Sequence, residues 1–280
     1  MKTLKSISAV TFLLFIMLTS GMGEISITPV HVEVIGGTYK AGTTSVSISS
    51  FMIDKYEVTF ELWTEVRDWA LKKGYTDLSA GRNGFNPAGP DNPVTEISWY
   101  DVVKWCNARS EKEGYSPVYF IDNDWKTIYR TGQINISAEQ VNWTENGYRL
   151  PTEYEWEFAV RRGNQTHAYN FSGSNTLADV AWCNSNSGNT THPVGLKKPN
   201  ELGIHDMSGN VYEWCWDFYA KEYQNGETKD PKGPLTSQNN TRVIKGGPFY
   251  CNDLGGSIDY CSYDLPARGN RTYGFRNVMN

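Results

Sequence analysis

Positive charge is scarce in this sequence. Its 26 Lys and Arg residues are outnumbered by 31 Asp and Glu residues, which gives a formal net charge of −5 and a pI near 5.5. Proteins bind nucleic acid largely because lysine and arginine neutralise phosphates, and a chain without a basic field lacks that source of affinity. Nucleic acid is therefore not an expected partner.

Closely spaced metal ligands are also missing. The five cysteines, Cys106, Cys183, Cys215, Cys251 and Cys261, form no Cys-x-x-Cys pair, and the four histidines are scattered along the chain. Structural zinc sites need Cys and His ligands at short, regular spacings, so no zinc site is expected. Because the number of cysteines is odd, at least one thiol of an exported chain would stay unpaired or pair with another molecule.

Long hydrophobic runs are absent except at the N-terminus. Two lysines precede an apolar run from Ile7 to Leu18, and small residues follow at 20–23, as in a secretory signal. The run is shorter than the roughly 20 residues that span a bilayer. We predict a signal peptide over residues 1–23 and no stable membrane span in the mature chain. The protein is expected to be exported, either secreted or held at the cell surface.

No internal repeat, low-complexity block or linker divides the remaining chain, so one domain is expected over residues 24–280. Apolar residues at helical spacing predict three short helices, capped by Thr59, by Ser98 and by Thr152 with Glu155. Short strands are expected at 31–39, 44–51, 118–120, 127–129 and 242–244. Much of the chain is rich in Gly, Asn and Pro. These expectations combine short helices with short strands.

Two groups of acidic residues deserve separate interpretations. Glu153, Glu155 and Glu157 lie at the start of a predicted helix, where the helix dipole explains them better than acid-base catalysis does. Asp206 and Glu213 flank a turn at 208–209, and carboxylates together with turn carbonyls form the oxygen set that calcium prefers. The alternative for the second group is a turn into a strand with solvated acids.

The C-terminal tail segment, residues 248–273, differs from the rest of the chain. It lies between Gly246-Gly247 and Gly274-Phe275-Arg276, shows neither helical nor strand periodicity, and contains no Lys, Glu, Gln, Met or Trp. Turn-forming residues and large aromatic side chains of this kind are typical of a binding surface. The side chains predicted to contact a ligand are Phe249, Tyr250, Asn252, Asp253, Leu254, Ile258, Asp259, Tyr260, Tyr263, Asp264 and Leu265.

From about residue 33 to the C-terminus, the chain resembles the formylglycine-generating-enzyme family, also called sulfatase-modifying factors. The motifs that carry the resemblance are Glu57-Val58-Thr59, residues 93–101, residues 148–157, residues 203–214, Gly246-Gly247 and Gly274-Phe275-Arg276. The resemblance implies a C-type lectin fold of the formylglycine-generating-enzyme type, which is an α+β fold with little regular secondary structure. It also implies a structural calcium ion held by the side chains of Asp206 and Glu213 and by the carbonyl groups of Gly209 and Val211.

The family includes oxidases, iron-dependent enzymes and pure binding proteins, so the fold alone does not fix the activity. The oxidases carry a more closely spaced redox Cys pair, whereas nine residues separate Cys251 from Cys261 here. Neighbouring acids such as Asp253 and Asp259 would also disfavour a reactive thiolate. The iron-dependent branch needs a His cluster, which is missing.

The chain is more similar to the variable proteins of diversity-generating retroelements. In that group, mutagenesis of adenines in template codons produces no Lys, Glu, Gln, Met or Trp, the types absent from residues 248–273. We therefore predict a binding protein rather than an enzyme. Its ligand would be a protein or another macromolecule of unknown identity. The alternatives are a formylglycine-generating oxidase acting on a sulfatase cysteine, and a structural surface protein without a defined ligand.

Overall fold

The computed structural model describes residues 30–86, 89, 91–161, 169–221, 228–237 and 239–280. The predicted signal peptide lies outside the described residues. Helix accounts for 19% and strand for 21% of the described residues, and this helix content is well below the roughly 30–35% of a typical soluble domain. The predicted α+β fold with little regular structure is confirmed. Within the described residues, no helix has the length and apolar character to cross a membrane.

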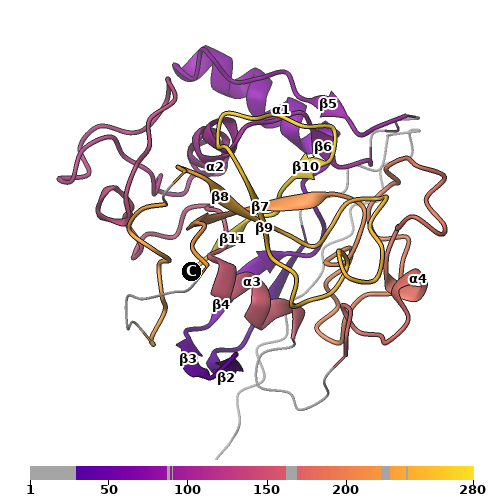
Figure 1. The fold of residues 1–280 in the computed structure, drawn as a ribbon. Coiled ribbons are helices and arrows are strands. Elements are labelled where there is room, and N and C mark those ends of the chain that lie inside the picture. Colours follow the sequence, from indigo (N-terminus) through magenta and orange to yellow (C-terminus); the bar gives the residue numbers. More distant parts are fainter. Residues whose placement is uncertain (1–29, 87–88, 90, 162–168, 222–227, 238) are drawn as a thin grey trace, which may run out of the picture.

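A three-stranded antiparallel sheet joins the two ends of the described chain (Figure 1). Its strands, in spatial order, are β1 (His31–Val34), β4 (Phe51–Asp54) and β11 (Val278–Met279). Val278 lies opposite Ile53 in the register. The residues that follow the tail segment are therefore fixed to the N-terminal part of the fold.

A four-stranded mixed sheet carries the tail segment (Figure 1). Its strands, in spatial order, are β10 (Tyr273–Gly274), β7 (Tyr212–Phe218), β8 (Arg242–Lys245) and β9 (Ser262–Asp264). β10 is parallel to β7, and the other pairs are antiparallel. The tail segment leaves the end of β8, contributes the edge strand β9 and returns as β10. Two hairpins complete the strands: β2 (Gly37–Ala41) with β3 (Thr44–Ile48), and β5 (Arg82–Asn83) with β6 (Val94–Thr95).

The three predicted helices form, each with its predicted cap. They are α1 (Phe60–Ala70), α2 (Trp99–Glu113) and α3 (Glu153–Val160). Thr59 accepts a hydrogen bond from Leu62 N, and Ser98 and Thr152 each form a full capping box. The short helices η1 (Leu71–Lys73), η2 (Ala138–Gln140) and α4 (Leu177–Val180) were not expected. Side-chain oxygens at N-caps satisfy backbone donors that would otherwise lack partners, which explains why these boundaries could be predicted.

The prediction of strands at 118–120 and 127–129 was wrong. The backbone there forms only isolated bridges, Phe120 with Ile128 and Tyr119 with Val141. The buried Asn107 side chain of α2 donates to the carbonyls of Tyr119 and Tyr129, at 2.8 and 3.2 Å, and accepts from the Tyr119 amide. One amide side chain thus takes backbone groups that a strand ladder would have paired.

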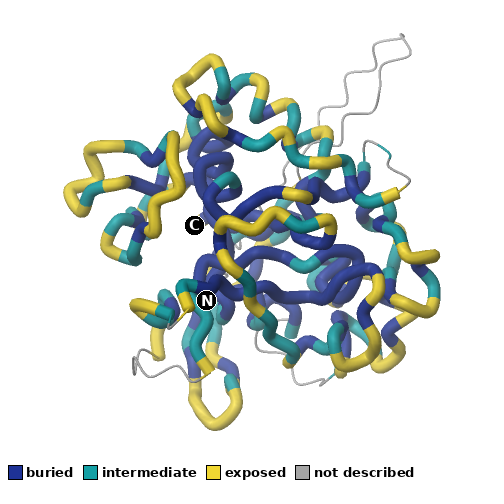
Figure 2. Tube along the Cα trace, turned by 45° about the horizontal axis from the view of Figure 1, so that its top comes forward, coloured by how far each residue is buried: buried dark blue, intermediate teal, exposed yellow. Residues whose placement is uncertain are grey.

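Aromatic packing anchors the chain directly after the tail segment. Phe275 meets Trp63 of α1 and Trp105 of α2 edge-on, with ring centroids 5.9 and 5.3 Å apart, and the two indoles stack at 5.4 Å. All three side chains are fully buried. Burying one Phe side chain contributes about 1.5–3 kcal/mol. Buried segments of the chain run through the centre of the molecule, and exposed loops lie outside them (Figure 2). Phe275 and Arg276 are fully buried, so the Gly-Phe-Arg motif belongs to the core.

Candidate functional site

The tail segment begins at a tightly fitted turn. Gly246 and Gly247 both have left-handed φ angles, 88° and 81°, which favour glycine. A Cβ atom on Gly247 would lie 2.3 Å from the carbonyl oxygen of Gly255, so the backbone itself occupies that space. Just before this turn, the buried Lys245 forms ion pairs with Glu157 at 2.9 Å and Glu153 at 3.5 Å. The start of the segment is therefore held in one conformation.

Between the two anchors, large side chains point into solvent. Leu254 is 68% exposed, Tyr263 48%, Tyr250 46% and Leu265 44%. Nine of the predicted contact residues are at least partly accessible: Tyr250, Asn252, Asp253, Leu254, Asp259, Tyr263 and Leu265 are exposed, and Tyr260 and Asp264 are half-buried. Large apolar groups of this kind in one short segment are a feature of recognition surfaces.

Two predicted contact residues, Phe249 and Ile258, have to be corrected. Phe249 is fully buried and stacks on Phe85, with centroids 5.6 Å apart and planes within 5°. Ile258 is 5% exposed and packs in the hydrophobic core. Both side chains support the segment from below because the turns around them direct them inward. Without periodicity in the sequence, nothing marked them as inward-facing.

Tyrosines from outside the predicted set extend the exposed surface. Tyr219 stacks on Tyr263, with centroids 4.0 Å apart. Tyr212 packs edge-on against Tyr273 at 6.1 Å, and the Tyr273 hydroxyl donates to Asp264 Oδ2 at 2.5 Å. Burial, followed by the neighbouring Tyr260 and Tyr250, raises the pKa of Tyr212, which places these rings close together.

We call Tyr212, Tyr219, Tyr250, Tyr260 and Tyr263 the tyrosine face, against which the buried Tyr273 packs. Tyr212 begins β7, and Tyr219 follows its end. These two rings could have been anticipated only from the pairing of β7 with the strands of the tail segment, which the sequence does not show. The face combines aromatic rings with hydroxyl groups, a composition suited to a partner that is partly polar and partly apolar.

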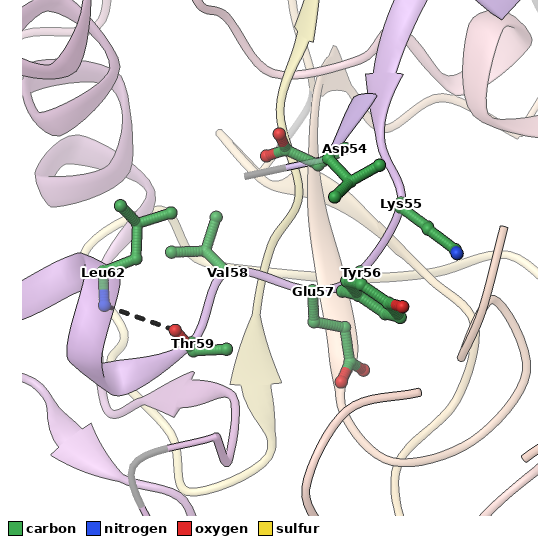
Figure 3. Close-up of a pocket in the computed structure, with 8 residues that line it drawn as sticks. Asp54, Lys55, Tyr56, Glu57, Val58, Thr59 and Leu62 are labelled. Atoms are coloured by element: carbon green, nitrogen blue, oxygen red, sulfur yellow. Dashed lines mark hydrogen bonds between the residues drawn. The ribbon is translucent and has the colours of Figure 1, made fainter. Parts of the chain in front are cut away.

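Three buried carboxylates surround one guanidinium group beside the tail segment. Arg276 contacts both carboxylate oxygens of Glu213 at 2.7 Å, and both residues are fully buried. Glu57 accepts from Asn210 Nδ2 at 2.6 Å, and its side chain points away from that of Asp54 (Figure 3). A cavity of about 30 Å³ lies against residues 54–59 and has room for one water molecule.

The charges in this cluster do not balance. Burial raises the pKa of Asp206 to about 6, with Glu213 adding to the effect. Burial, followed by Asp206 and Glu213, raises the pKa of Glu57 well above its ordinary value. One guanidinium therefore does not compensate three carboxylates. An additional cation would relieve the excess negative charge.

Three of the four groups predicted to bind calcium have oxygens available to such a cation. Asp206 Oδ1 is buried and has no hydrogen-bond partner. The carbonyl groups of Gly209 and Val211 accept no backbone hydrogen bond from the residues that the structure describes. Glu213 is the exception, because Arg276 shares its oxygens. The described part of the chain has no group of three or more His, Cys, Asp or Glu side chains that could hold a metal ion. The predicted calcium set is of a different kind, because it combines two carboxylates with two backbone carbonyls.

Calcium is therefore expected to bind and stabilise the protein. At a free concentration one hundred times the Kd, it would add about 2.7 kcal/mol to the free energy of unfolding. The measurement is urea denaturation with calcium or with a chelator. Replacement of Asp206 by Asn should remove most of the response, and magnesium should act more weakly because it prefers a stricter octahedral site. Equal stability with and without calcium, together with no binding in calorimetry, would contradict this expectation.

The cysteines do not form the pair that an oxidase would need. All five are free, and Cys251 and Cys261 lie in different parts of the packing. Burial raises the pKa of Cys251 to about 12, with Cys183 adding to the effect. Burial, followed by Glu153, also raises the pKa of Cys261 above the usual range of a thiol. Reactive cysteines need the opposite shift, towards the thiolate.

Known proteins share this architecture over most of its length. The chaperone protein LppX of Paenibacillus barcinonensis is 35% identical over 271 residues, which span 86% of this chain and 85% of the relative. The formylglycine-generating enzyme of Thermomonospora curvata is 27% identical over 285 residues, spanning 85% and 86% of the two chains. The solved structure of Treponema denticola variable protein 1 is 28% identical and aligns with a TM-score of 0.70 over 89% of this chain and 94% of that one.

These similarities confirm the C-type lectin fold of the formylglycine-generating-enzyme type. They also confirm the resemblance to variable proteins. The family model of the sulfatase-modifying factor enzyme 1-like domain matches residues 20–280 of the sequence, and the chain is therefore a member of that family.

Proposed function

We propose that the protein is an exported, non-catalytic binding protein whose tail segment forms the contact surface for a protein ligand. The observation that carries the proposal is the contrast between exposed and buried residues within this segment. Tyr250, Leu254, Tyr263 and Leu265 are 44–68% exposed. The backbone beneath them is held by the buried Lys245 and Arg276. Recognition surfaces work best when a rigid base presents the contact groups.

The chemistry of the surface favours a protein partner. Tyrosine offers a large contact area with few rotatable bonds, so ordering it on binding costs little conformational entropy. The tyrosine face stacks within itself, as in the Tyr219–Tyr263 pair, and this reduces the entropy cost further. A cluster of exposed tyrosine side chains resembles the hot spots of protein interfaces, in which tyrosine is enriched.

The relatives support the same proposal. One is named a chaperone protein and another a variable protein. We infer that the tail segment of this chain is the variable part, because residues 248–273 lack Lys, Glu, Gln, Met and Trp. The tail segment also consists largely of loops over a packed base, where sequence changes affect recognition more than stability.

Sister copies of the sequence provide the test of this proposal. If the segment is varied by a retroelement, sequences from several isolates should differ mainly at codons within 248–273 and remain nearly identical elsewhere. The buried Phe249 and Ile258 should change less often than the exposed Tyr250 and Leu254. Differences spread evenly along the chain would favour a structural surface protein and would overturn the proposal.

Loss of a single tyrosine from the face is expected to weaken partner binding strongly. With a partner in hand, the Tyr250→Ala and Tyr263→Ala changes should each weaken binding at least about 30-fold, since interface hot spots contribute 2 kcal/mol or more. Surface plasmon resonance would measure the Kd. The matched control is Tyr115→Ala, because Tyr115 is 36% exposed but lies outside the tail segment. Equal losses for all three variants would argue against a binding face at the tail.

The rival function is oxidation of a peptide cysteine, which a 27% identical relative named formylglycine-generating enzyme keeps under consideration. The assay supplies a sulfatase-type cysteine peptide, copper and oxygen, and follows aldehyde formation by mass spectrometry. We expect no turnover, because burial holds the pKa of Cys251 at about 12. Turnover that disappears in a Cys251→Ser variant would establish the oxidase in place of the binding protein.

A further inference from the structure

A pocket opens beside the tyrosine face, between the first turn of the tail segment and the loop that follows α4. Its volume is about 420 Å³, enough to admit a long side chain. The residues that line it are Leu177, Cys183, Asn184, Ser185, Cys251, Asn252, Asp253 and Leu254. Half of them belong to the tail segment, so the pocket is part of the proposed contact surface.

The floor of the pocket is apolar and well held. Leu177, Cys183 and Cys251 are 2–6% exposed and belong to one hydrophobic cluster. The amide of Asn184 donates to the carbonyl of Cys251 at 3.0 Å, which ties the two walls together. A Cβ atom on Gly256 would lie 2.6 Å from Leu177 Cδ1, so glycine at this position lets the tail turn rest on the leucine. The pocket is therefore formed before any ligand arrives.

One uncompensated negative charge lies at the rim of the pocket. Of the three acids in the tail segment, Asp259 pairs with Arg161, and Asp264 pairs with Arg268 at 3.0 Å. Asp253 is exposed and has neither an ion pair nor a hydrogen bond with any residue in the described ranges. An apolar floor with a single free carboxylate above it is complementary to an aliphatic stem that ends in a positive charge.

Nearby lysines of the chain itself do not supply that charge. Lys197 donates to the carbonyl of Ala178 at 3.0 Å and lies over the Trp182 ring. Lys198 is 3.9 Å from Asp179. Both are thus engaged with residues of α4 or with Trp182. Among the residues that the structure describes, no lysine or arginine pairs with Asp253, which leaves its carboxylate available to a partner.

We propose that this pocket binds a lysine side chain of the protein partner, with the stem on Leu177 and the cysteines and the ammonium group at Asp253. This inference rests on the proposed function and names the chemistry that its ligand presents. Lysine is the better match to the apolar floor, because its four-carbon stem is longer than the three-carbon stem of arginine and ends in a compact positive charge.

Small probes test the pocket without the partner. The probe is Nα-acetyl-lysine N-methylamide, and the matched probe is Nα-acetyl-norleucine N-methylamide, which has the same stem without the charge. Backbone amide shifts in isotope-labelled protein would locate each probe, and titration would give each Kd. We expect shifts at residues 183–185 and 251–254, and binding of the lysine probe at least about tenfold tighter than that of norleucine. Added salt should reduce the difference.

Two variants separate charge from packing. In Asp253→Asn the ratio of the norleucine-probe Kd to the lysine-probe Kd should fall to near one. Asp259→Asn should keep the wild-type ratio, because Arg161 already neutralises Asp259. Both side chains are exposed, so neither change should alter the melting temperature. Equal binding of the two probes, an undiminished preference in Asp253→Asn, or shifts confined to other residues would overturn the inference.

Failure of the pocket proposal can be distinguished from failure of the broader proposal. Lysine-probe binding in the pocket, together with sister sequences that vary evenly along the chain, would refute the variable binding face and leave the pocket intact. Variation confined to residues 248–273, without lysine-probe binding, would do the reverse.

Discussion

Replacing Arg276 by methionine is expected to lower the free energy of unfolding by about 3–5 kcal/mol, because removing one partner of a buried pair leaves an uncompensated charge. Arg276 contacts both oxygens of Glu213 at 2.7 Å and also donates to the His205 carbonyl at 2.9 Å. With the guanidinium gone, Glu213, Glu57 and Asp206 would remain buried without a cation from the protein. Urea denaturation of the calcium-free protein would measure the loss.

The control for this variant is another arginine of the same region. Arg268 pairs with Asp264 at 3.0 Å, but its side chain is 57% exposed. Its replacement by methionine should therefore cost only about 0–1 kcal/mol. Adding Glu213→Gln to Arg276→Met should recover part of the stability, since the change also removes a buried negative charge. Similar losses for the two arginines would contradict the assigned role of Arg276.

Removing Asp54 is expected to have an effect of comparable size. Its carboxylate accepts from Arg109 at 3.1 Å and from the Asn277 amide at 2.9 Å, and it lies 3.1 Å from His31 Nε2. Arg109 is fully buried on α2. In Asp54→Ala this guanidinium would lose its main partner, at a cost of about 3–5 kcal/mol. Calorimetry would measure the change. The exposed pair Lys126–Asp124 gives the control, because Asp124→Ala should be nearly neutral.

The same aspartate makes stability depend on pH. Burial alone would raise the pKa of Asp54, but Arg109 and His31 outweigh burial and hold it below its ordinary value of 3.8. Because the folded-state pKa is the lower one, this stabilisation is present above pH 3.8 and is lost as pH falls through the folded-state pKa. Asp54→Ala should therefore lose more stability at pH 6 than at pH 3. A constant difference between the two proteins over this range would argue against the assigned network.

Local signals in the sequence are sufficient for the three longer helices, α1, α2 and α3. Thr59, Ser98 and Thr152 were assigned as caps from the residues that follow them, and each accepts the expected backbone hydrogen bond. Such contacts span three residues, so the sequence shows both partners at once. The strand prediction for residues 118–129 failed because the competing partner for their backbone groups, Asn107, lies on a preceding helix and not among neighbouring residues.

The binding surface was predictable in outline but not in detail. Composition identified the tail segment, and Tyr250 and Tyr263 do reach solvent. The inward turn of Phe249 depends on Phe85, which lies far away in the sequence. The contribution of Tyr219 depends on the pairing of strands. Where the orientation of a side chain is decided by tertiary contacts, a segment without periodicity gives no local indication of it.

The pairing of β11 with β4 has a consequence for biosynthesis. Ile53 and Met52 in β4 pair with β1 on one side, but their partners on the other side, Val278 and Met279, lie near the end of the chain. The ribosome must therefore complete nearly the whole described chain before this sheet can close, and native pairing of the first strands with the last is postponed until then. Long-range contacts of this kind also slow folding, because a large loop has to be closed before they form. Substitutions between residues 248 and 273 enter the protein just ahead of that closing step, after most of the molecule has already been translated.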